Sequence, residues 1–486
     1  MEGLDRRQLL ERAGGVALGL GIAAAVPEWA LAGGPTSGQL KQLGRQLKGP
    51  VVTPSNPAYA RDRVIVNQRY DGVHPAAIAY CENVSDVQKT VTWARNHGIH
   101  IVPRCGRHSY AGYSTTSGVV VDVSRMSSVH PSGGTAVVGA GAILIDVYTK
   151  LWAQHRTIPG GSCPTVGIAG LTQGGGIGYA SRKFGTTADN VKQLTIVTAD
   201  GKARVCNAKQ NSDLYWACRG GGGGNFGIVT SFVFETHPVS NASTFYITWP
   251  WSSAARVVRA WQSFAPHASR SLFSVCILSG SSGGSRSVSA QGQFFGSLSA
   301  LRRLLRPLLV GGASLSIKQR SYIDAVMYYA NCSSLAQCRV LPRETFKAKS
   351  DYCLKPLSGK GISTLLDWIP RTPGGTSVIL DSYGGAINAV PKSATAFAHR
   401  DALFSMQYYQ GWGGSGSAAN LSFIRSFYKA MRPFVSGYAY VNYIDPDLTN
   451  WPHAYYGSNY ARLVKVKRKY DPHNIFNFPQ SIRLKT

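Results

Sequence analysis

Short apolar runs alternate with one helical pattern between residues 64 and 140. Four of these runs are rich in strand-forming residues and read AIAYCE, HIVPRC, GVVVDVS and TAVVGAG. The segment VSDVQKTVTWARNHG, residues 84–98, has apolar positions at helical spacing, starts near Ser85 and Asp86, and ends on Gly98. The pattern predicts short strands and one helix in this region.

Farther along the chain the pattern changes twice. Residues 160–235 place two glycine-rich runs between strand-like segments such as QLTIVTAD and FGIVTSFVFET. From about residue 240 to 425, longer strands such as TFYITWPW and SLFSVCILSG alternate with helices such as LSALRRLLRPLL, which fits an antiparallel sheet covered by helices. The last 60 residues return to short aromatic strands and a basic helix. We therefore expect an α+β fold.

Length and charge refine this expectation. A chain of 486 residues is too long for one compact core, so two lobes are expected. The net charge is +28, but the basic residues are spread along the chain without a basic arm or the spacing of a DNA-binding motif, so we expect no nucleic-acid partner. We interpret the densest run, VKVKRKYD at 464–471, as a solvated face, and the overall charge as favouring solubility and attraction to anionic surfaces.

The nine cysteines do not suggest a metal site. They include no Cys-x-x-Cys pair and no Cys/His spacing typical of zinc, so no metal is expected. Cys332 and Cys338 lie six positions apart in a polar segment and could form a small disulfide loop. Most of the others sit in apolar surroundings typical of core residues.

The N-terminal segment has the features of an export signal. Residues 5–10 read DRRQLL and precede an apolar stretch at 13–26 and the sequence Ala30-Leu31-Ala32. Arg6-Arg7 resembles a bacterial twin-arginine signal, and the apolar run is shorter than the ~20 residues that span a bilayer. We expect residues 1–32 to be removed and the remaining chain to be secreted, soluble and free of membrane contact.

The glycine-rich runs at 163–191 and 216–232 indicate loops that approach a ligand closely. Glycines at 174, 175, 176 and 178 remove side chains where backbone N–H groups could surround a pyrophosphate. Neither run is followed by Gly-Lys-Ser/Thr, which excludes a P-loop. The Rossmann pattern also matches poorly, because no acidic residue closes a βαβ unit at the required distance.

The order of the motifs identifies a family. RCGRHSYAGYS, PGGSCPTVGIAGLTQGGGIG, ADNV, VTADG and WACRGGGGGNFGIVT are followed by YGGAIN, YVNYID, YYGSNYARL and KYDPHNIFNFPQSI. This order resembles the FAD-linked oxidases of the berberine bridge enzyme type, in the vanillyl-alcohol oxidase and p-cresol methylhydroxylase superfamily. The resemblance runs from about residue 56 to 482.

The resemblance implies how the chain is organised. We expect a FAD-binding domain of the p-cresol methylhydroxylase type at 56–238 and a substrate-binding domain at 239–428 with an antiparallel sheet covered by helices. A C-terminal segment, 429–486, should return to the FAD domain. The chain could be a monomer.

The resemblance also implies a flavin bonded to the protein at two positions. His108 corresponds to the histidine that bonds the 8α-methyl group, and Cys163 to the cysteine that bonds flavin C6. The imidazole nitrogen and the thiolate are both nucleophiles suited to this chemistry. The chain departs from the family at Gly106-Arg107, where the family usually has Gly-Gly, and an arginine there adds bulk and charge beside the flavin edge.

Several other residues are assigned to the cofactor by their motif positions. Val166, the third residue after the flavin-linked cysteine, matches a position beside the flavin where valine accompanies reactivity with oxygen. The remaining expected FAD contacts are Arg104, Gly106, Arg107, Ser109, Gly112, Gly167, Gly170, Gly174, Gly175, Gly176, Gly178, Asn190, Gly227, Ile228, Val229 and Asn459.

Two tyrosines are the candidate catalytic residues. Tyr443, in YVNYID, matches the family tyrosine that takes the proton of the substrate hydroxyl, and Tyr110 matches one near the substrate. A phenol with an ordinary pKa near ~10 is a poor base at neutral pH, so it needs cationic or hydrogen-bonding neighbours, and Arg107 is one conceivable source. Other residues flank matched motifs and are expected to contact substrate. Because neighbouring residues of a strand point to opposite faces, not all of them can face the flavin. They are Asp381, Tyr383, Gln407 and Tyr409.

These expectations define an extracellular FAD oxidase. It would oxidise an alcohol or a C–H bond and pass the electrons to oxygen, which forms hydrogen peroxide. The substrate would be either a sugar or oligosaccharide, or a secondary metabolite undergoing a tailoring oxidation or cyclisation. A flavin-bearing binding protein without turnover is the alternative from a different class.

Overall fold

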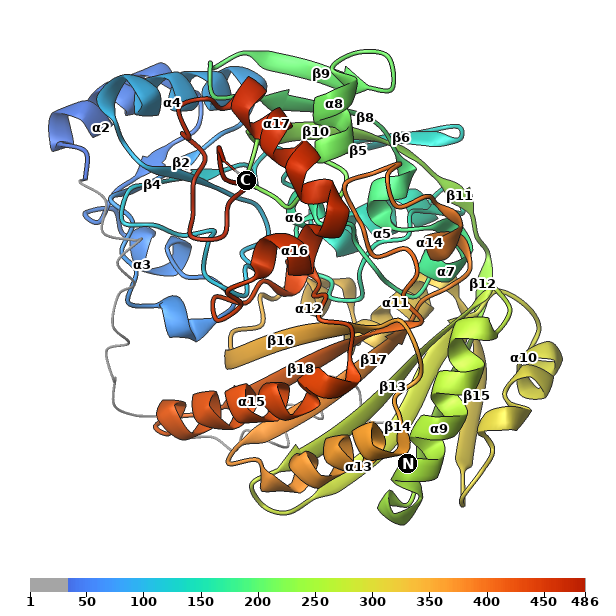
Figure 1. Ribbon diagram of the computed structural model, residues 1–486. Helices are drawn as coiled ribbons and strands as arrows, with labels where there is room; N and C mark the ends of the chain where they lie inside the picture. The colour runs from blue at the N-terminus through green and yellow to red at the C-terminus, as the bar shows by residue number, and fades with distance from the viewer. Residues whose placement is uncertain (1–33, 486) are drawn as a thin grey trace.

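The chain folds into two units with the C-terminal segment packed across them (Figure 1). The computed structural model describes residues 34–485, so the expected signal peptide at 1–32 lies outside the described residues. Within the described range no helix combines the length and the apolar character needed to cross a bilayer. The first unit contains two larger sheets, which share one hydrophobic core, and a two-stranded sheet of β7 (Arg156–Thr157) and β11 (His237–Pro238).

The four-stranded sheet of the first unit has the strand order β1-β2-β4-β3. The pairs β2–β4 and β4–β3 are parallel, and helix α4 (Val84–His97) connects β2 to β3. This confirms the predicted helix: the Asn83 side chain accepts a hydrogen bond from the Asp86 amide at its start, and Gly98 ends it with φ +65°. The strands are β1 (Val51–Val52), β2 (Ala77–Tyr80), β3 (Ile101–Arg104) and β4 (Val119–Asp122).

The second sheet of this unit is antiparallel, with the order β5-β6-β10-β8-β9. Its strands are β5 (Val129–Ser132), β6 (Thr135–Gly139), β8 (Val191–Val197), β9 (Ala203–Asn207) and β10 (Ile228–Glu235). The remaining elements of the unit are α2 (Ser37–Gln46), α3 (Tyr59–Asp62), α5 (Leu144–Trp152), β7 (Arg156–Thr157), α6 (Ile168–Gln173), α7 (Ser181–Phe184), α8 (Ser212–Ala217) and β11 (His237–Pro238).

The second unit is a seven-stranded antiparallel sheet with the order β15-β12-β14-β13-β17-β18-β16. Helices α9, α13 and α15 cover one face, and the other face looks toward the first unit (Figure 1). The strands are β12 (Asn241–Trp249), β13 (Leu272–Ser281), β14 (Arg286–Phe294), β15 (Ser314–Ser321), β16 (Thr345–Cys353), β17 (Gly375–Ser382) and β18 (Phe404–Trp412). The helices are α9 (Ala254–Phe264), α10 (Leu298–Leu304), α11 (Tyr322–Ala330), α12 (Leu335–Cys338), α13 (Gly359–Trp368), α14 (Ala386–Ala389) and α15 (Ser417–Met431).

The structure places the expected domain boundaries as follows. The boundary at 238/239 falls between β11 and β12, and the one at 428/429 falls inside α15. The first unit also includes residues before 56, because β1 pairs with β2 and Leu43 of α2 is buried. Cys332 and Cys338 are joined by a disulfide, with Cα atoms 5.3 Å apart.

The C-terminal segment returns to the first unit through α16 (Trp451–Tyr456) and α17 (Tyr460–Tyr470) (Figure 1). Helix α17 carries the basic run that we interpreted as a solvated face. Lys467 departs from that interpretation: it is fully buried and donates hydrogen bonds to Asp471 Oδ2 at 2.7 Å and to the Asn225 carbonyl at 2.8 Å. The buried lysine thereby attaches this helix to the second glycine run.

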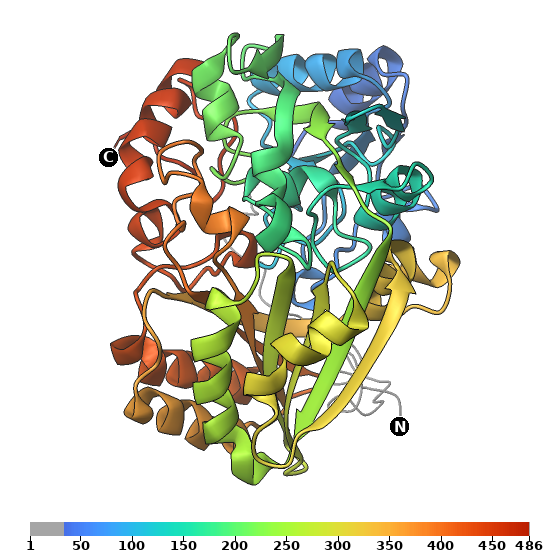
Figure 2. The same cartoon turned by 90° about the vertical axis from the view of Figure 1, so that its right-hand side faces the viewer.

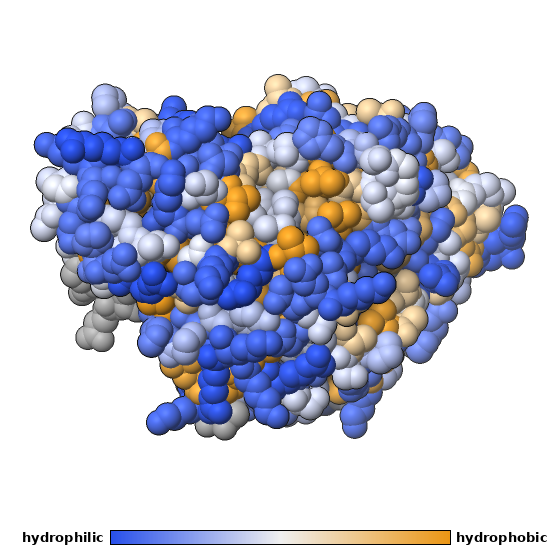
Figure 3. Space-filling view, turned by 90° about the horizontal axis from the view of Figure 1, so that it is seen from above, coloured by the Kyte–Doolittle hydropathy of each residue, from blue (hydrophilic) through white to orange (hydrophobic). Residues whose placement is uncertain are grey.

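The outer surface above the first unit is largely hydrophilic, with small separate apolar areas (Figure 3). Among residues 34–485, the large hydrophobic side chains that are exposed are Val137, Leu309 and Val340. Scattered apolar residues of this kind are normal on a folded protein.

Candidate active site

A cavity of about 270 Å³ lies between the loops of the first unit and the C-terminal segment. Four stretches supply most of its wall: 103–110, 161–173, 222–229 and 440–444. The predicted residues that line it are Arg104, Gly106, Arg107, His108, Ser109, Tyr110, Cys163, Val166, Gly167, Gly170, Gly227, Ile228, Val229 and Tyr443. The structure thus brings both proposed flavin nucleophiles and both candidate catalytic tyrosines to one cavity.

Close backbone packing explains the glycines at two of these positions. A Cβ atom on Gly106 would lie closer than 3 Å to the backbone of Gly167, and one on Gly167 would lie closer than 3 Å to Cys105 Sγ. The loop that carries His108 can therefore pack against the segment that follows Cys163 only while both residues are glycine.

Packing against other protein atoms does not explain the glycine at position 170. It is exposed to the cavity within α6, and a Cβ atom there would have no heavy atom within 4 Å. Alanine would be the better helix former by about 1 kcal/mol, so neither packing nor helix propensity favours glycine here. Gly223 is similar, since the nearest atom to its Cβ would be 3.7 Å away. Both positions leave open space that a ligand can occupy.

Arg107 has an unusual backbone conformation. Its φ is +64°, in the left-handed region that favours glycine, which gives a physical reason for the glycine usual at this position in similar proteins. Its guanidinium donates a hydrogen bond to the Arg61 carbonyl at 3.4 Å. Burial lowers the pKa of Arg107 from its ordinary value, and the neighbouring Arg104 charge adds to this.

One part of the wall offers several hydrogen-bond donors without a protein acceptor. Arg104 donates Nε–H to Asp122 Oδ2 at 2.6 Å, but its buried Nη1 and Nη2 have no partner among residues 34–485. Within the same range, the amides of Arg107, His108 and Ser109 donate no hydrogen bond to a backbone or side-chain acceptor. Consecutive N–H groups beside a guanidinium form a concave site that suits a pyrophosphate.

The two candidate flavin ligands have chemically suitable surroundings. Burial lowers the pKa of His108 to about 4, so its imidazole is neutral near pH 7 and retains a nucleophilic nitrogen. One ring nitrogen, Nε2, lies 2.8 Å from Thr165 Oγ1, which orients the ring. Cys163 is partly exposed on the cavity wall.

The first glycine run serves protein packing, contrary to our expectation of a pyrophosphate cradle. Residues 174, 175, 176 and 178 do not line the cavity, and a Cβ atom on any of them would lie closer than 3 Å to a neighbouring protein atom. The Gly176 amide donates to the Tyr440 hydroxyl at 2.9 Å instead. Gly112 is likewise outside the lining, and a Cβ atom there would lie closer than 3 Å to the ring of Tyr70.

Two predicted asparagines also lie outside the lining and organise loops. Asn190 donates to the carbonyls of Phe184 and Thr186 at 2.9 and 2.8 Å. Asn459 donates to the carbonyl of Lys392 at 2.9 Å. Neither side chain faces the cavity wall, so any effect on the cofactor would be indirect.

The prediction missed several lining residues that adjacent motifs contained. Tyr440 and Asn442 share the YVNYID motif with Tyr443, and glycines 222–224 belong to the second glycine run. The Asn442 amide donates to the Tyr440 hydroxyl at 2.9 Å and to the Leu171 carbonyl at 3.0 Å. These bonds attach the C-terminal segment to the helix that contains Gly170.

The two candidate catalytic tyrosines are in contact. The rings of Tyr110 and Tyr443 stack with centroids 5.4 Å apart and an interplanar angle of 18°. Gln407 donates its amide to the Tyr110 hydroxyl at 3.1 Å. The edge of Phe346 packs on Tyr110 at 4.9 Å, so the sheet of the second unit supports the pair.

Strand register decides how the candidate substrate residues lie. Asp381 pairs with Ser405, and residues 405, 407 and 409 alternate along β18, so Asp381, Gln407 and Tyr409 share the face toward the first unit. We expected that not all four candidate substrate residues could face the flavin, and these three share one face of the sheet. Tyr409 is buried against Phe346 with ring centroids 4.9 Å apart, whereas Asp381 remains partly exposed.

Tyr383 is the exception among these candidates. It lies just beyond the end of β17, is fully buried, and its hydroxyl lies 3.1 Å from that of Tyr352. Burial raises its pKa well above the usual value. Tyr383 itself does not line the cavity, but it belongs to a buried cluster that includes the lining residue Tyr440 and against which Tyr443 packs.

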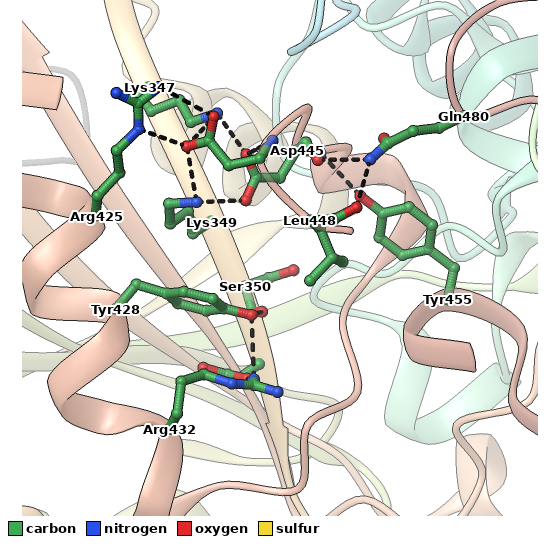
Figure 4. A network of polar contacts seen from close by, with 12 residues as sticks. Lys347, Lys349, Ser350, Arg425, Tyr428, Arg432, Asp445, Leu448, Tyr455 and Gln480 are labelled. Atoms are coloured by element: carbon green, nitrogen blue, oxygen red, sulfur yellow. Dashed lines mark hydrogen bonds and ion pairs between the residues drawn. The ribbon is translucent and has the colours of Figure 1, made fainter. Parts of the chain in front are cut away.

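A buried ionic network holds the loop that carries Tyr443 (Figure 4). Lys347 and Lys349 of β16 are each 3% exposed, and both pair with Asp445, with a Lys349 Nζ–Asp445 Oδ2 distance of 2.7 Å. Lys349 also pairs with Asp447 at 3.0 Å. Because Asp445 follows Tyr443 by two residues, these pairs tie the tyrosine loop to the sheet.

Charges set the protonation of the second aspartate in this network. Burial acts to raise the pKa of Asp447, but the hydrogen bond from Arg425 at 3.0 Å and the two lysine charges outweigh it. The pKa therefore lies well below the usual range, and Asp447 stays ionised. On the other side of the loop, Gln480 donates to the Asp445 carbonyl at 2.8 Å.

Comparison with known proteins agrees with this geometry. A family described as FAD binding domain matches residues 75–207, and one described as berberine and berberine like matches residues 439–483. The fold and the cavity are those of a FAD-linked oxidoreductase. The chain belongs to the berberine bridge enzyme-like family of these enzymes.

Three relatives illustrate the similarity. The uncharacterized FAD-linked oxidoreductase YgaK of Bacillus subtilis (strain 168) is 36% identical over 448 residues, which covers 90% of this chain and 97% of the relative. The structure of BBE-like 1 from Physcomitrella patens is 34% identical with a TM-score of 0.86, covering 92% of this chain and 99% of that one. The xylooligosaccharide oxidase from Myceliophthora thermophila C1, solved in complex with xylobiose, is 27% identical with a TM-score of 0.83 and the same coverage.

Proposed function

We propose that this chain is an oxidase that holds FAD through His108 and Cys163 and oxidises a hydroxyl group of a sugar or oligosaccharide with oxygen. The observation that carries the proposal is the stacked pair Tyr110–Tyr443, with Gln407 bonded to Tyr110, beside the cavity that contains both nucleophiles. The structural similarity to a xylooligosaccharide oxidase supports a sugar as the substrate class.

Two features of the wall suit parts of FAD. Arg104 and the amides of residues 107–109 would hold the pyrophosphate, because these buried donors have no acceptor within residues 34–485. Gly170 and Gly223 leave space where side chains would otherwise project. FAD held there would supply a hydride acceptor for the substrate carbon and a two-electron donor to oxygen, with hydrogen peroxide as the product.

Tyr443 would take the proton of the substrate hydroxyl as the general base. Its ring stacks on Tyr110, whose hydroxyl oxygen accepts a hydrogen bond from Gln407. A hydroxyl so placed can hydrogen-bond a neighbouring phenolate or the substrate oxygen. The lysine and aspartate pairs at Asp445 would keep the ring at a fixed distance from the substrate.

A peroxide assay tests this function. Purified protein is supplied with a panel of mono- and oligosaccharides and, in parallel, with aromatic alcohols, and hydrogen peroxide is measured. We expect peroxide with at least one sugar. Peroxide from the aromatic alcohols alone would assign the enzyme to secondary-metabolite oxidation. Flavin bound without peroxide from any member would support a binding protein without turnover.

We also propose that the protein is secreted by the twin-arginine route. The support is the sequence pattern Arg6-Arg7, the apolar stretch at 13–26, and Ala30-Leu31-Ala32. The secreted chain should begin at Gly33, and replacing both arginines with lysine should retain it in the cytoplasm. N-terminal sequencing and cell fractionation check the two outcomes, and unchanged secretion of the double variant would contradict the route.

A further inference from the structure

One long stretch of the chain contains no acidic residue. Between residues 236 and 323 there are nine Lys or Arg residues and no Asp or Glu. The chain as a whole has roughly one acidic residue for every two basic ones, 23 against 51. The positive charge is therefore least compensated in this stretch.

The fold gathers this stretch on one side of the second unit. Helix α9, helix α10, the turn at 306–308 and strand β15 lie against one another, and they face the viewer in Figure 2. Six arginine side chains on this side are exposed: Arg256, Arg259, Arg302, Arg303, Arg306 and, at the start of β14, Arg286. We call these six residues and the elements that carry them the arginine face.

The arginine face has no internal counter-charge. Within the described part of the chain, none of the six side chains forms an ion pair with a carboxylate. Exposed cations elsewhere do, as shown by Lys192–Glu235 at 2.5 Å and Lys469–Asp213 at 2.7 Å. Uncompensated positive charge on one surface produces an attractive field for anions.

The chemistry of the arginine face narrows the kind of anion. All six cations are arginines, whose planar forks bind carboxylate groups with two parallel hydrogen bonds. The partly exposed Trp251 lies 5.9 Å from the Arg286 guanidinium, and Leu309 on the turn is 41% exposed. Apolar and aromatic groups among arginines suit a ligand that alternates charged groups with apolar sugar faces.

The arginine face is separate from the candidate active site. Strand β15 forms one edge of the seven-stranded sheet, and β16, which carries Phe346 beside Tyr110, forms the other. A ligand on the arginine face would therefore leave the cavity open. A polymer held there could present its free ends to the cavity at raised local concentration.

We propose that the arginine face is a docking site for a carboxylate-bearing polysaccharide. The choice of a sugar polymer rests on the proposed function, whereas the preference for an anion rests on the charges alone. Binding is measured directly, so the result does not depend on whether the enzyme oxidises sugars.

The test uses the flavin-loaded secreted protein and polygalacturonate as the probe. Affinity is measured by biolayer interferometry at increasing sodium chloride, with neutral dextran, duplex DNA and anionic phospholipid vesicles in parallel. We expect binding to polygalacturonate that weakens with salt, and no binding to dextran. A triple variant, Arg302→Gln, Arg303→Gln and Arg306→Gln, should bind about tenfold more weakly, as expected for the loss of three exposed charge contacts.

The matched control removes three exposed lysines from the first unit: Lys150→Gln, Lys202→Gln and Lys209→Gln. It has the same net charge as the arginine triple and should change the affinity less than twofold. A second variant of the face, Arg256→Gln with Arg259→Gln, should also weaken binding while circular dichroism remains unchanged. Equal losses in the face and control variants, no binding to polygalacturonate, or tighter binding to DNA or vesicles would overturn the proposal.

Discussion

The two walls of the active-site cavity are built in different ways. The wall from the first unit consists of loops whose backbones touch, so that a Cβ atom on Gly106 or Gly167 would lie closer than 3 Å to its neighbour. The opposite wall is the C-terminal stretch 440–444, where Tyr443 stacks on Tyr110. Side chains from separate strands of the second unit, Gln407 of β18 and Phe346 of β16, support Tyr110 from outside the lining. One wall is fixed by backbone contacts, and the other by register between distant segments.

This difference assigns different tasks to the walls. Tight backbone packing leaves unpaired N–H groups and the buried Arg104 nitrogens in fixed positions, which suits a large permanent cofactor. The opposite wall relies on side chains that substitution can change without moving the backbone, which suits variation in substrate. We therefore expect substitutions on the first wall to affect cofactor retention and those on the second to affect turnover.

The largest expected effect concerns cofactor retention on the first wall. Replacing both His108 and Cys163 with alanine should release all flavin, because both proposed bonds would be absent. Each single variant should keep one link, so acid-precipitated protein should stay yellow and its mass should exceed that of the chain by one FAD. Mass spectrometry and the colour of the acid pellet measure this, and a colourless pellet from the unmodified protein would contradict covalent attachment.

The next effect concerns turnover. Replacing Tyr443 with phenylalanine keeps the stack on Tyr110 but removes the phenolic oxygen, so flavin loading should remain intact. Loss of the general base should slow flavin reduction by about 10²–10⁴-fold. Anaerobic stopped-flow measures this step without oxygen.

Tyr409→Phe is the matched control. Tyr409 lies on β18, on the sheet face toward the first unit, and its ring packs on Phe346 rather than on Tyr443. Its rate of flavin reduction should stay within about threefold, or about 0.7 kcal/mol, of the unmodified rate. If Tyr443→Phe reduces its flavin at the unmodified rate, the base is another residue, and Asp381, partly exposed on the same face, becomes the candidate.

A smaller effect is expected for oxygen reactivity. Val166 is partly exposed on the first wall, and Val166→Ile adds one methylene to a closely packed site. Reoxidation by oxygen should slow by about tenfold, which corresponds to about 1.4 kcal/mol of barrier, while flavin reduction by substrate stays nearly constant. Stopped-flow measurement of both half-reactions decides the point: equal small changes in both would show that Val166 is ordinary packing.

The contrast between the walls also explains what the sequence revealed. The α4 helix and its Gly98 end follow from local spacing in the sequence. The lining positions His108, Cys163 and Val166 were expected from the resemblance of their motifs to the berberine bridge enzyme family, because these motifs are runs of consecutive residues. The positions of Gln407 and Asp381 depend on how β17 and β18 pair, which no local pattern determines. Glycines 174, 175, 176 and 178 look like a phosphate loop in sequence, yet the first three have Asn442, Phe397 and Thr187 from elsewhere in the chain as neighbours.

The burial of Lys347 and Lys349 could not be predicted from the sequence either. Lys347 and Lys349 alternate with apolar residues on β16, a pattern typical of a strand with one solvated face. In the structure both lysines are buried, because they pair with Asp445 and Asp447, which lie nearly 100 residues later in the C-terminal segment (Figure 4). Only the tertiary fold supplies the partners that make burial of these lysines tolerable.

The smallest expected effect tests the strained position on the first wall. Arg107 has φ +64°, which disfavours any side chain with a Cβ atom, so Arg107→Gly should relieve strain. Glycine also makes the unfolded chain more flexible, which offsets part of the gain, so we expect a net stabilisation of about 1 kcal/mol and a rise in Tm of roughly 1–2 °C. Arg107→Ala is the matched control: it removes the same guanidinium contact with Arg61 but keeps the Cβ atom, so it should give no stabilisation. Differential scanning calorimetry of the flavin-loaded proteins compares them. If alanine and glycine shift Tm equally, the change comes from the lost side chain, and backbone strain at this position contributes nothing.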